Sequence, residues 1–143
     1  MTPSRADSLG RGLLDTNVLI HWPRLDPTQL PAEAAISTIT LAEFAAGVHA
    51  ARDSLVRAHR LELLQRTERE FDPIPFDVAA ARAYGRITAA VARLGRSPRS
   101  RVADRMIAAI AASRDLALYT TTPADYASLG DVLDVVAMSR PSD

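Results

Sequence analysis

Short apolar segments alternate with longer amphipathic segments along this chain, and the alternation restricts the possible folds more than any other feature. Strands are predicted at residues 12–14, 35–37, 116–120 and 132–136. Helices are predicted directly after residue 15, from about residue 40, over residues 53–70, from residue 77 to about 94, over residues 102–113, and briefly at 123–127. This alternation is typical of parallel sheets covered on both faces. The predicted fold class is therefore α/β, a three-layer α/β/α sandwich with a mainly parallel central sheet.

Composition limits both the size of the fold and its possible chemistry. A chain of 143 residues is expected to form one domain with its own core. It contains no cysteine, which excludes thiolate metal sites and cysteine nucleophiles. All 17 basic residues are arginine, which excludes Walker-type phosphate loops and Schiff-base chemistry, since both need lysine. No stretch approaches the roughly 20 apolar residues of a membrane span, so we expect a cytoplasmic protein without membrane contact.

Acidic residues stand near the starts of three predicted helices. Asp15 follows the first strand, Glu43 comes three residues after Thr40, and Asp104 lies in the first turn of its helix. Each has a structural explanation. Asp is a preferred N-cap, Thr40 and Glu43 match a capping box, and an acid in a first helical turn meets the positive end of the macrodipole. Taken singly, none of these acids indicates a site.

The same acids are more informative as a set. Open α/β sheets place their sites beyond the carboxyl ends of the strands, where Asp15 is predicted to lie and where the other two acids could converge with it. Clustered carboxylates repel one another, so a fold tolerates them mainly where a cation offsets the charge. Oxygen ligands without cysteine or a histidine cluster favour Mg²⁺, with Mn²⁺ as a substitute. Such a site suits phosphodiester hydrolysis by an activated water.

Four segments resemble the ordered motifs of PIN domains, and in particular those of the VapC toxins of bacterial VapBC toxin-antitoxin pairs. They are Leu13-Leu14-Asp15-Thr16-Asn17-Val18-Leu19-Ile20, residues 38–47 with Leu41-Ala42-Glu43-Phe44 inside, residues 102–109 around Asp104, and residues 118–126. The ordered set covers almost the whole chain and is more specific than any one motif.

This resemblance implies a PIN-like fold, with residues 1–143 as a single PIN domain, and a Mg²⁺-dependent endoribonuclease. Asp15 and Asp104 carry over as the main metal ligands, and Glu43 as the third acid of the catalytic set. The resemblance also implies a cognate VapB-type antitoxin that blocks the site, an RNA substrate and a toxin homodimer. A small reading frame immediately upstream of the gene would favour the toxin assignment.

The fourth motif departs from the family pattern. The family usually has Asn or Asp where this chain has Thr122, and the nearest acid is Asp125, three residues further on. Thr16, Asn17 and Thr120 match polar positions that are expected to order water or backbone around the metal. The departure puts the fourth position, and with it a second metal ion, in doubt.

Arginines gather just before and around Asp104. Arg96, Arg99, Arg101 and Arg105 are candidate RNA-binding residues, since a guanidinium can pair with phosphate bidentately. The alternative is a solvated loop and helix start. The formal net charge is zero, so RNA binding would need such a local patch.

Other functions remain open at this stage. A catalytically silent PIN-like module would keep the fold and bind antitoxin or RNA without cleavage, and a related nuclease could cut DNA. Response-regulator receivers and haloacid-dehalogenase-like phosphatases also place acids at strand ends, but both need a lysine that this chain lacks. The three histidines are not spaced as a metal-binding set, and we interpret them as structural or surface residues.

Overall fold

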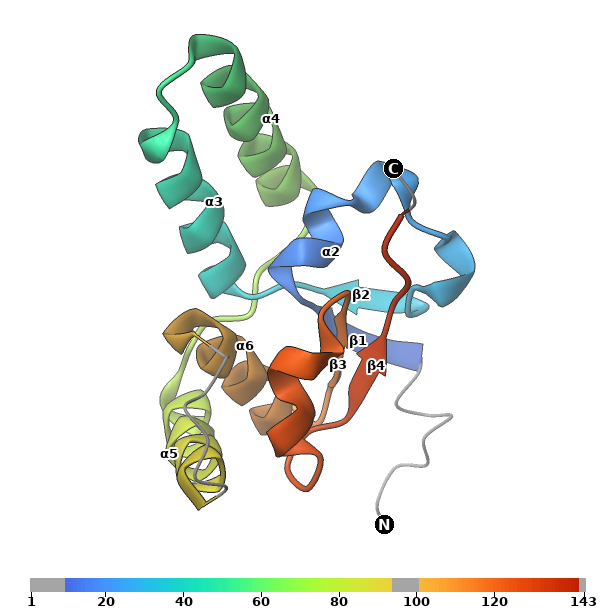
Figure 1. The fold of residues 1–143 in the computed structure, drawn as a ribbon, viewed down its shortest axis with the longest axis vertical. Coiled ribbons are helices and arrows are strands. Elements are labelled where there is room, and N and C mark those ends of the chain that lie inside the picture. Colours follow the sequence, from blue (N-terminus) through green and yellow to red (C-terminus); the bar gives the residue numbers. More distant parts are fainter. Residues whose placement is uncertain (1–9, 94–100, 142–143) are drawn as a thin grey trace.

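A central parallel sheet organises the computed structural model, which describes residues 10–93 and 101–141 (Figure 1). The strands are β1 (Arg11–Leu14), β2 (Glu33–Ala35), β3 (Ala117–Thr120) and β4 (Val135–Ala137), in the order β2-β1-β3-β4. Every neighbouring pair is parallel, and Leu13 of β1 lies opposite Ala35 of β2 and Leu118 of β3. The predicted α/β class is confirmed, and the sheet is parallel throughout.

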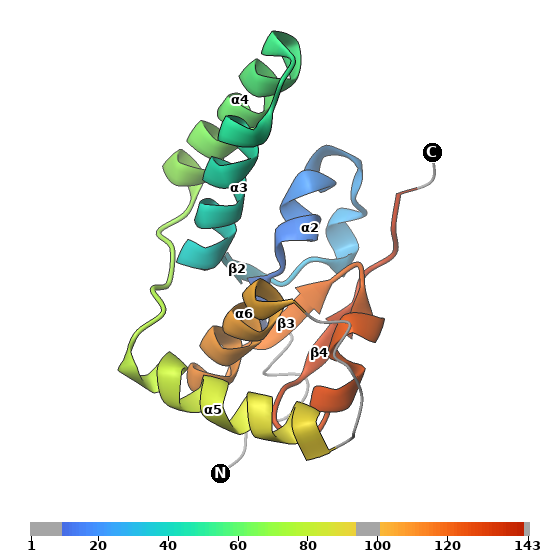
Figure 2. The same cartoon turned by 60° about the vertical axis from the view of Figure 1, so that its left-hand side comes forward.

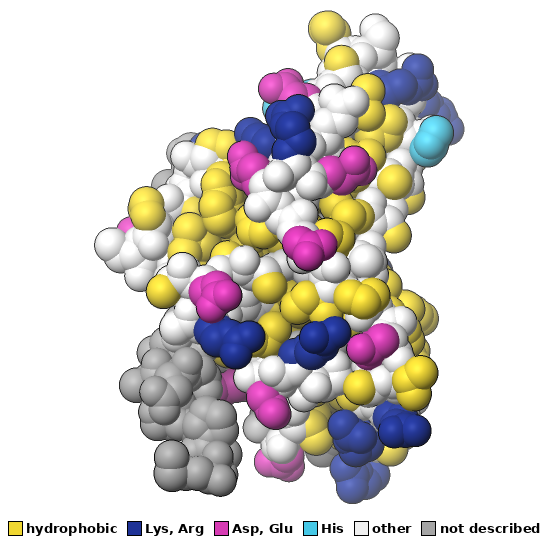
Figure 3. Space-filling model, turned by 180° about the vertical axis from the view of Figure 1, so that it is seen from behind, with side chains coloured by type: hydrophobic (Ala, Val, Ile, Leu, Met, Phe, Trp, Pro, Cys, Tyr) yellow, Lys and Arg dark blue, Asp and Glu magenta, His cyan; other side chains and the backbone are white. Residues whose placement is uncertain are grey.

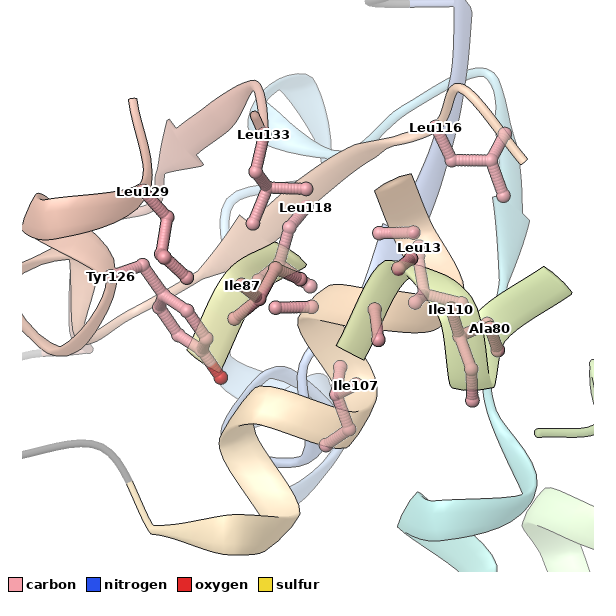
Figure 4. Packing of buried hydrophobic residues seen from close by; sticks show 14 of the residues in the cluster. Leu13, Ala80, Ile87, Ile107, Ile110, Leu116, Leu118, Tyr126, Leu129 and Leu133 are labelled. Atoms are coloured by element: carbon pink, nitrogen blue, oxygen red, sulfur yellow. The ribbon is translucent and has the colours of Figure 1, made fainter. Parts of the chain in front are cut away.

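The two central strands bury both of their faces. Leu13 and Leu118 pack in the cluster that includes α5 (Val78–Arg93) and α6 (Val102–Ser113), as Figure 4 shows. Leu14 and Tyr119 point the other way, into the cluster that includes α2 (Thr16–Ile20) and α3 (Thr38–Ala50). Successive residues of a strand point to opposite faces, so this division follows from the pleat. It produces the predicted three layers.

Helices α3 and α4 (Ser54–Glu70) form a hairpin that extends away from the sheet (Figures 1 and 2). The Arg60 guanidinium donates a 2.8 Å hydrogen bond to the carbonyl of Gly47 and ties the two helices together. Most of α4 is exposed, in keeping with its many charged residues, and Leu55 is 80% exposed. No helix within the described parts of the chain is long and apolar enough to cross a bilayer.

The segment before α3 differs from the prediction by two residues. The second strand ends at Ala35, not at Ser37, and α3 begins at Thr38, not near Thr40. Ser37 is the N-cap, because its hydroxyl accepts a 3.2 Å hydrogen bond from the Thr40 amide. The backbone here also pairs with Ile74, whose amide donates to the carbonyl of Ile36 at 2.9 Å. The pairing with Ile74 therefore helps to set where α3 starts.

The remaining elements lie close to their predicted positions. The proline-rich loop after α2 contains two short 3₁₀ helices, η1 (Trp22–Arg24) and η2 (Pro27–Gln29), and a third, η3 (Pro123–Leu129), follows β3. The last strand starts at Val135 instead of residue 132, because the amide of Val132 still bonds the carbonyl of Leu129. The predicted end of α5 near residues 94 and 95 falls outside the described residues.

Gly12 of β1 leaves room for the ring of Tyr119. A Cβ added at Gly12 would overlap Tyr119 Cε1 and would lie 3.2 Å from Cβ of Pro31, whereas a Cβ at Gly85 in α5 would meet nothing within 4 Å. Tyr119 is only 2% exposed and has little freedom to move. We predict that Gly12→Ala lowers the free energy of unfolding by about 1–3 kcal/mol, measured by urea denaturation. Gly85→Ala is the control and should be neutral or stabilising by up to ~1 kcal/mol; equal effects would contradict this packing.

Candidate metal and catalytic site

Asp15 is the first residue after β1 and is buried, with 3% of its surface exposed. Its Oδ1 accepts a 2.9 Å hydrogen bond from the amide of Thr16, so the carboxylate is the N-cap of α2. Its Oδ2 accepts from the hydroxyls of Thr120 at 2.8 Å and Tyr126 at 2.9 Å. The capping interpretation is correct for one oxygen, while the other is held by side chains from β3 and η3.

Burial dominates the electrostatics of Asp15. It raises the pKa of this carboxyl above the ordinary value of 3.8, while the hydrogen bonds from Thr120, Tyr126 and Thr16 lower it and the nearby charge of Asp104 raises it further. Burial together with the charges of Asp15 and Asp104 raises the pKa of the Tyr126 hydroxyl far above its ordinary value of 10.0. Tyr126 therefore stays protonated and acts as a donor to Asp15.

Asn17 links Asp15 to the end of β3. Its side-chain amide donates to Thr122 Oγ1 at 3.0 Å and makes longer contacts of 3.4 Å with Asp15 Oδ2 and Thr120 Oγ1. Its carbonyl oxygen accepts from the amide of Thr121 at 3.1 Å. Thr122 Oγ1 also lies 3.2 Å from Thr120 Oγ1. Thr122 thus belongs to the hydroxyl and amide network that orders the β3 end.

Glu43 does not form the predicted capping box. Ser37 is the N-cap of α3, which places Glu43 in the second turn of the helix, beyond the reach of a cap. Its Oε1 instead accepts a 2.7 Å hydrogen bond from the hydroxyl of Thr16, which lies 3.0 Å from the hydroxyl of the buried Thr40. The capping interpretation of Glu43 is wrong, and the side chain is directed toward the residue after Asp15.

Asp104 has a capping role as well as a place beside Asp15. It is 8% exposed, and its Oδ2 accepts a 3.1 Å hydrogen bond from the amide of Arg101 at the start of α6. Its charge contributes to the raised pKa of both Asp15 and Tyr126, so Asp104 lies near these two side chains. Asp125 lies in the first turn of η3, and its charge contributes least to the raised pKa of Tyr126.

The donor set suits a hard divalent cation, although the ligand set is incomplete. Within residues 10–93 and 101–141, no group of three or more Asp, Glu, His or Cys side chains is arranged to hold a metal ion. Mg²⁺ needs fewer protein ligands than such a group provides, because it is usually bound by one or two carboxylates together with waters and substrate phosphates. Asp15 and Asp104 are the candidates for such a pair. Burial is the main cause of the raised pKa of Asp15, and a cation between the two residues would offset the smaller contribution from the charge of Asp104.

Sequence reasoning identified most of this network but not all of it. Thr40 was assigned to a cap, and its contact with Thr16 spans 24 positions of the chain. Tyr126 ends the segment 118–126 that resembles the fourth motif, and no role in holding Asp15 was predicted for it from the sequence. Of the candidate RNA-binding residues, Arg101 and Arg105 belong to the start of α6, while Arg96 and Arg99 lie outside the described residues.

The raised pKa of Asp15 predicts a pH-dependent stability. The folded protein holds the Asp15 proton more tightly than the unfolded chain, whose pKa is near 3.8. The free energy of unfolding should therefore fall as pH rises from 3.8 through the raised pKa, by up to about 1.4 kcal/mol per pH unit. Urea denaturation with EDTA, from pH 4 to 8, measures this slope. Asp15→Asn should lack this component, and identical slopes in the two proteins would refute the effect.

The comparisons with known proteins agree with this architecture. The family model of the PIN domain matches residues 12–130. Ribonuclease VapC5 of Mycobacterium tuberculosis is 38% identical over 127 residues, which are 87% of this chain and 91% of that protein.

The crystal structure of the VapBC-5 toxin-antitoxin system from the same species has a TM-score of 0.79 and 37% identity, covering 92% of this chain and 99% of that one. The DNA-bound VapBC of Salmonella typhimurium has a TM-score of 0.71 and 25% identity, covering 87% and 96%. The chain therefore belongs to the PIN domain family, among the VapC proteins.

Proposed function

We propose that this protein is the toxin of a VapBC toxin-antitoxin pair and cleaves RNA as a Mg²⁺-dependent endoribonuclease. The carrying observation is the buried pair Asp15 and Asp104 at the carboxyl edge of the sheet, in a chain 38% identical to a ribonuclease VapC over most of its length. A divalent cation would offset the charge of these two carboxylates, and a phosphodiester is the substrate class that brings further oxygen ligands to it.

In this proposal Asp15 and Asp104 hold the metal, and Glu43 is the third acid. A bound divalent cation polarises the scissile phosphate and lowers the pKa of a coordinated water. Thr120 and Tyr126 fix the Asp15 carboxylate, so that it is oriented before the substrate arrives. Thr16 holds Oε1 of Glu43, and Oε2, which lies 3.7 Å from the guanidinium of Arg101, faces the proposed site. No protein nucleophile is required.

RNA binding is proposed to depend on the local arginines at the start of α6. Side chains of both signs are interspersed on the face in Figure 3, in keeping with a net charge of zero, so no uniform field attracts a polyanion there. Arg101 and Arg105 lie beside Asp104 in sequence, and Arg96 and Arg99 precede them. Guanidinium groups at these positions would contact phosphates next to the scissile bond.

The proposed regulation is a VapB-type antitoxin that covers the site, with the toxin itself a homodimer. The support comes from the crystal structures with which this chain shares its fold, which are toxin-antitoxin complexes.

Co-expression with the product of the neighbouring small reading frame should yield a stable complex that does not cleave RNA. Light scattering of the isolated protein at a mass near 15.4 kDa would refute the dimer.

The central test is cleavage of cellular RNA by the purified, antitoxin-free protein. We predict discrete products with Mg²⁺, none with EDTA, and a loss of at least about 100-fold in rate for Asp104→Asn, since this change removes a ligand charge but keeps an acceptor for the helix start. Circular dichroism should show an unchanged fold. Arg114→Gln, at the far end of α6, is the control and should cut normally.

Two results would contradict this assignment. Cleavage that survives both EDTA and Asp104→Asn would place the chemistry elsewhere, and no cleavage by the wild type would favour a silent binding module. A DNA substrate of the same sequence, tested in parallel, should remain intact.

The arginine patch predicts a specific salt dependence. If Arg96 and Arg99 each neutralise one phosphate, replacing both by Gln should flatten the plot of log binding constant against log salt by about 1.4 for single-stranded RNA. Fluorescence anisotropy with EDTA present would measure binding without cleavage. Arg82→Gln with Arg86→Gln on α5 is the matched charge control, and an equal change in both double variants would exclude a local patch.

A further inference from the structure

Arg101 connects two of the acids from different parts of the chain. It is the N-cap residue of α6, and its guanidinium lies 3.7 Å from Glu43 Oε2 and 3.9 Å from Asp104 Oδ2. The side chain of Arg101 is 76% exposed, whereas those of Glu43 and Asp104 are 24% and 11% exposed. The guanidinium therefore covers the two carboxylates from the solvent side.

This arrangement balances charge in the absence of a metal ion. Asp104 lies near the buried Asp15, and Glu43 accepts a hydrogen bond from Thr16, the next residue. A guanidinium cannot lose its proton, so Arg101 supplies a permanent positive charge next to Glu43 and Asp104. Both contacts are longer than 3.5 Å and are ion pairs without a direct hydrogen bond. An exposed ion pair of this kind is worth little, so the contacts can be exchanged at small cost.

The same contacts account for the incomplete ligand set. Among the described residues no three acids are arranged around one ion, and Glu43 has one oxygen bonded to Thr16 and the other paired with Arg101. A cation that used Glu43 and Asp104 together would have to take the place of the guanidinium. Metal and Arg101 would then compete for the same two carboxylates.

We propose that Arg101 is a built-in counter-ion of the metal-free site, which a divalent cation displaces from Glu43 and Asp104, so that its guanidinium becomes available to a substrate phosphate. This inference rests on the proposed function and adds a way in which metal binding would regulate RNA binding. Because coupling between two ligands is reciprocal, metal binding should strengthen RNA binding, and RNA phosphate should strengthen metal binding, through this one side chain.

Metal affinity measured without RNA tests the competition directly. Isothermal titration of the full chain with Mg²⁺ and with Mn²⁺ should give a dissociation constant about two- to ten-fold lower for Arg101→Gln than for the wild type, since two exposed ion pairs no longer oppose binding. Arg114→Gln is the matched control, because Arg114 pairs with Asp77 at 3.4 Å, away from the acids of the site. Its affinity should equal that of the wild type.

The displacement itself has a spectroscopic readout. The Nε–H signal of Arg101, assigned by its absence from the spectrum of Arg101→Gln, should shift during a Mg²⁺ titration in proportion to metal saturation. The Nε–H signal of Arg114 should stay in place. A tighter affinity in Arg101→Gln with a stationary Arg101 signal would mean a general field effect and would overturn the displacement.

The remaining outcomes are equally decisive. Unchanged or weaker metal affinity in Arg101→Gln, or no metal binding in either protein, overturns the proposal. Failure of the nuclease assignment would appear separately, as metal binding and Arg101 displacement without RNA cleavage.

Discussion

The buried carboxylate of Asp15 is the constraint on which the rest of this structure depends. Placing an ionised carboxylate where only 3% of the residue is exposed costs several kcal/mol unless donors surround it. Here the donors are the amide of Thr16, the side-chain amide of Asn17 and the hydroxyls of Thr120 and Tyr126. They come from α2, β3 and η3, so these elements must be correctly placed together before the charge is tolerated.

The parallel sheet makes this arrangement possible. β1 and β3 are neighbours, with Leu14 opposite Tyr119, so the residues that follow them, Asp15 and Thr120, meet at the same edge. The start of α6 brings Asp104 to that edge, and α3 contributes Glu43 through Thr16. Each acid also has a local structural role or partner. The fold already uses Asp15 and Asp104 at helix starts, whereas Glu43 is held by Thr16.

Much of the fold was predictable because its signals are local. The apolar strands and the N-cap at Asp15 follow from neighbouring residues, and the structure confirms this cap. The start of α5 is equally local, because Asp77 Oδ1 accepts a 2.9 Å hydrogen bond from the amide of Ala80. The parallel order of the strands followed from their alternation with helices.

The errors arose where contacts distant in sequence decide the outcome. Ser37 and Thr40 are both good N-cap residues, and the pairing of the preceding backbone with Ile74 selects Ser37. The partner of Glu43 lies 27 positions away, and that of Tyr126 lies 111 positions away, so periodicity could not reveal either. The approach of Asp104 to Asp15 was expected from the placement of the acids at helix starts and from the family motifs, and no local pattern fixed it.

The central claim is that Asp15 and Asp104 together hold a divalent cation. A crystal of the metal-free protein soaked in Mn²⁺ and measured for anomalous scattering tests it most directly. The account predicts one strong peak about 2.1 Å from a carboxylate oxygen of each residue, and none in a crystal of Asp104→Asn. A peak bound only by other residues, or no peak in the wild type at saturating Mn²⁺, would contradict it.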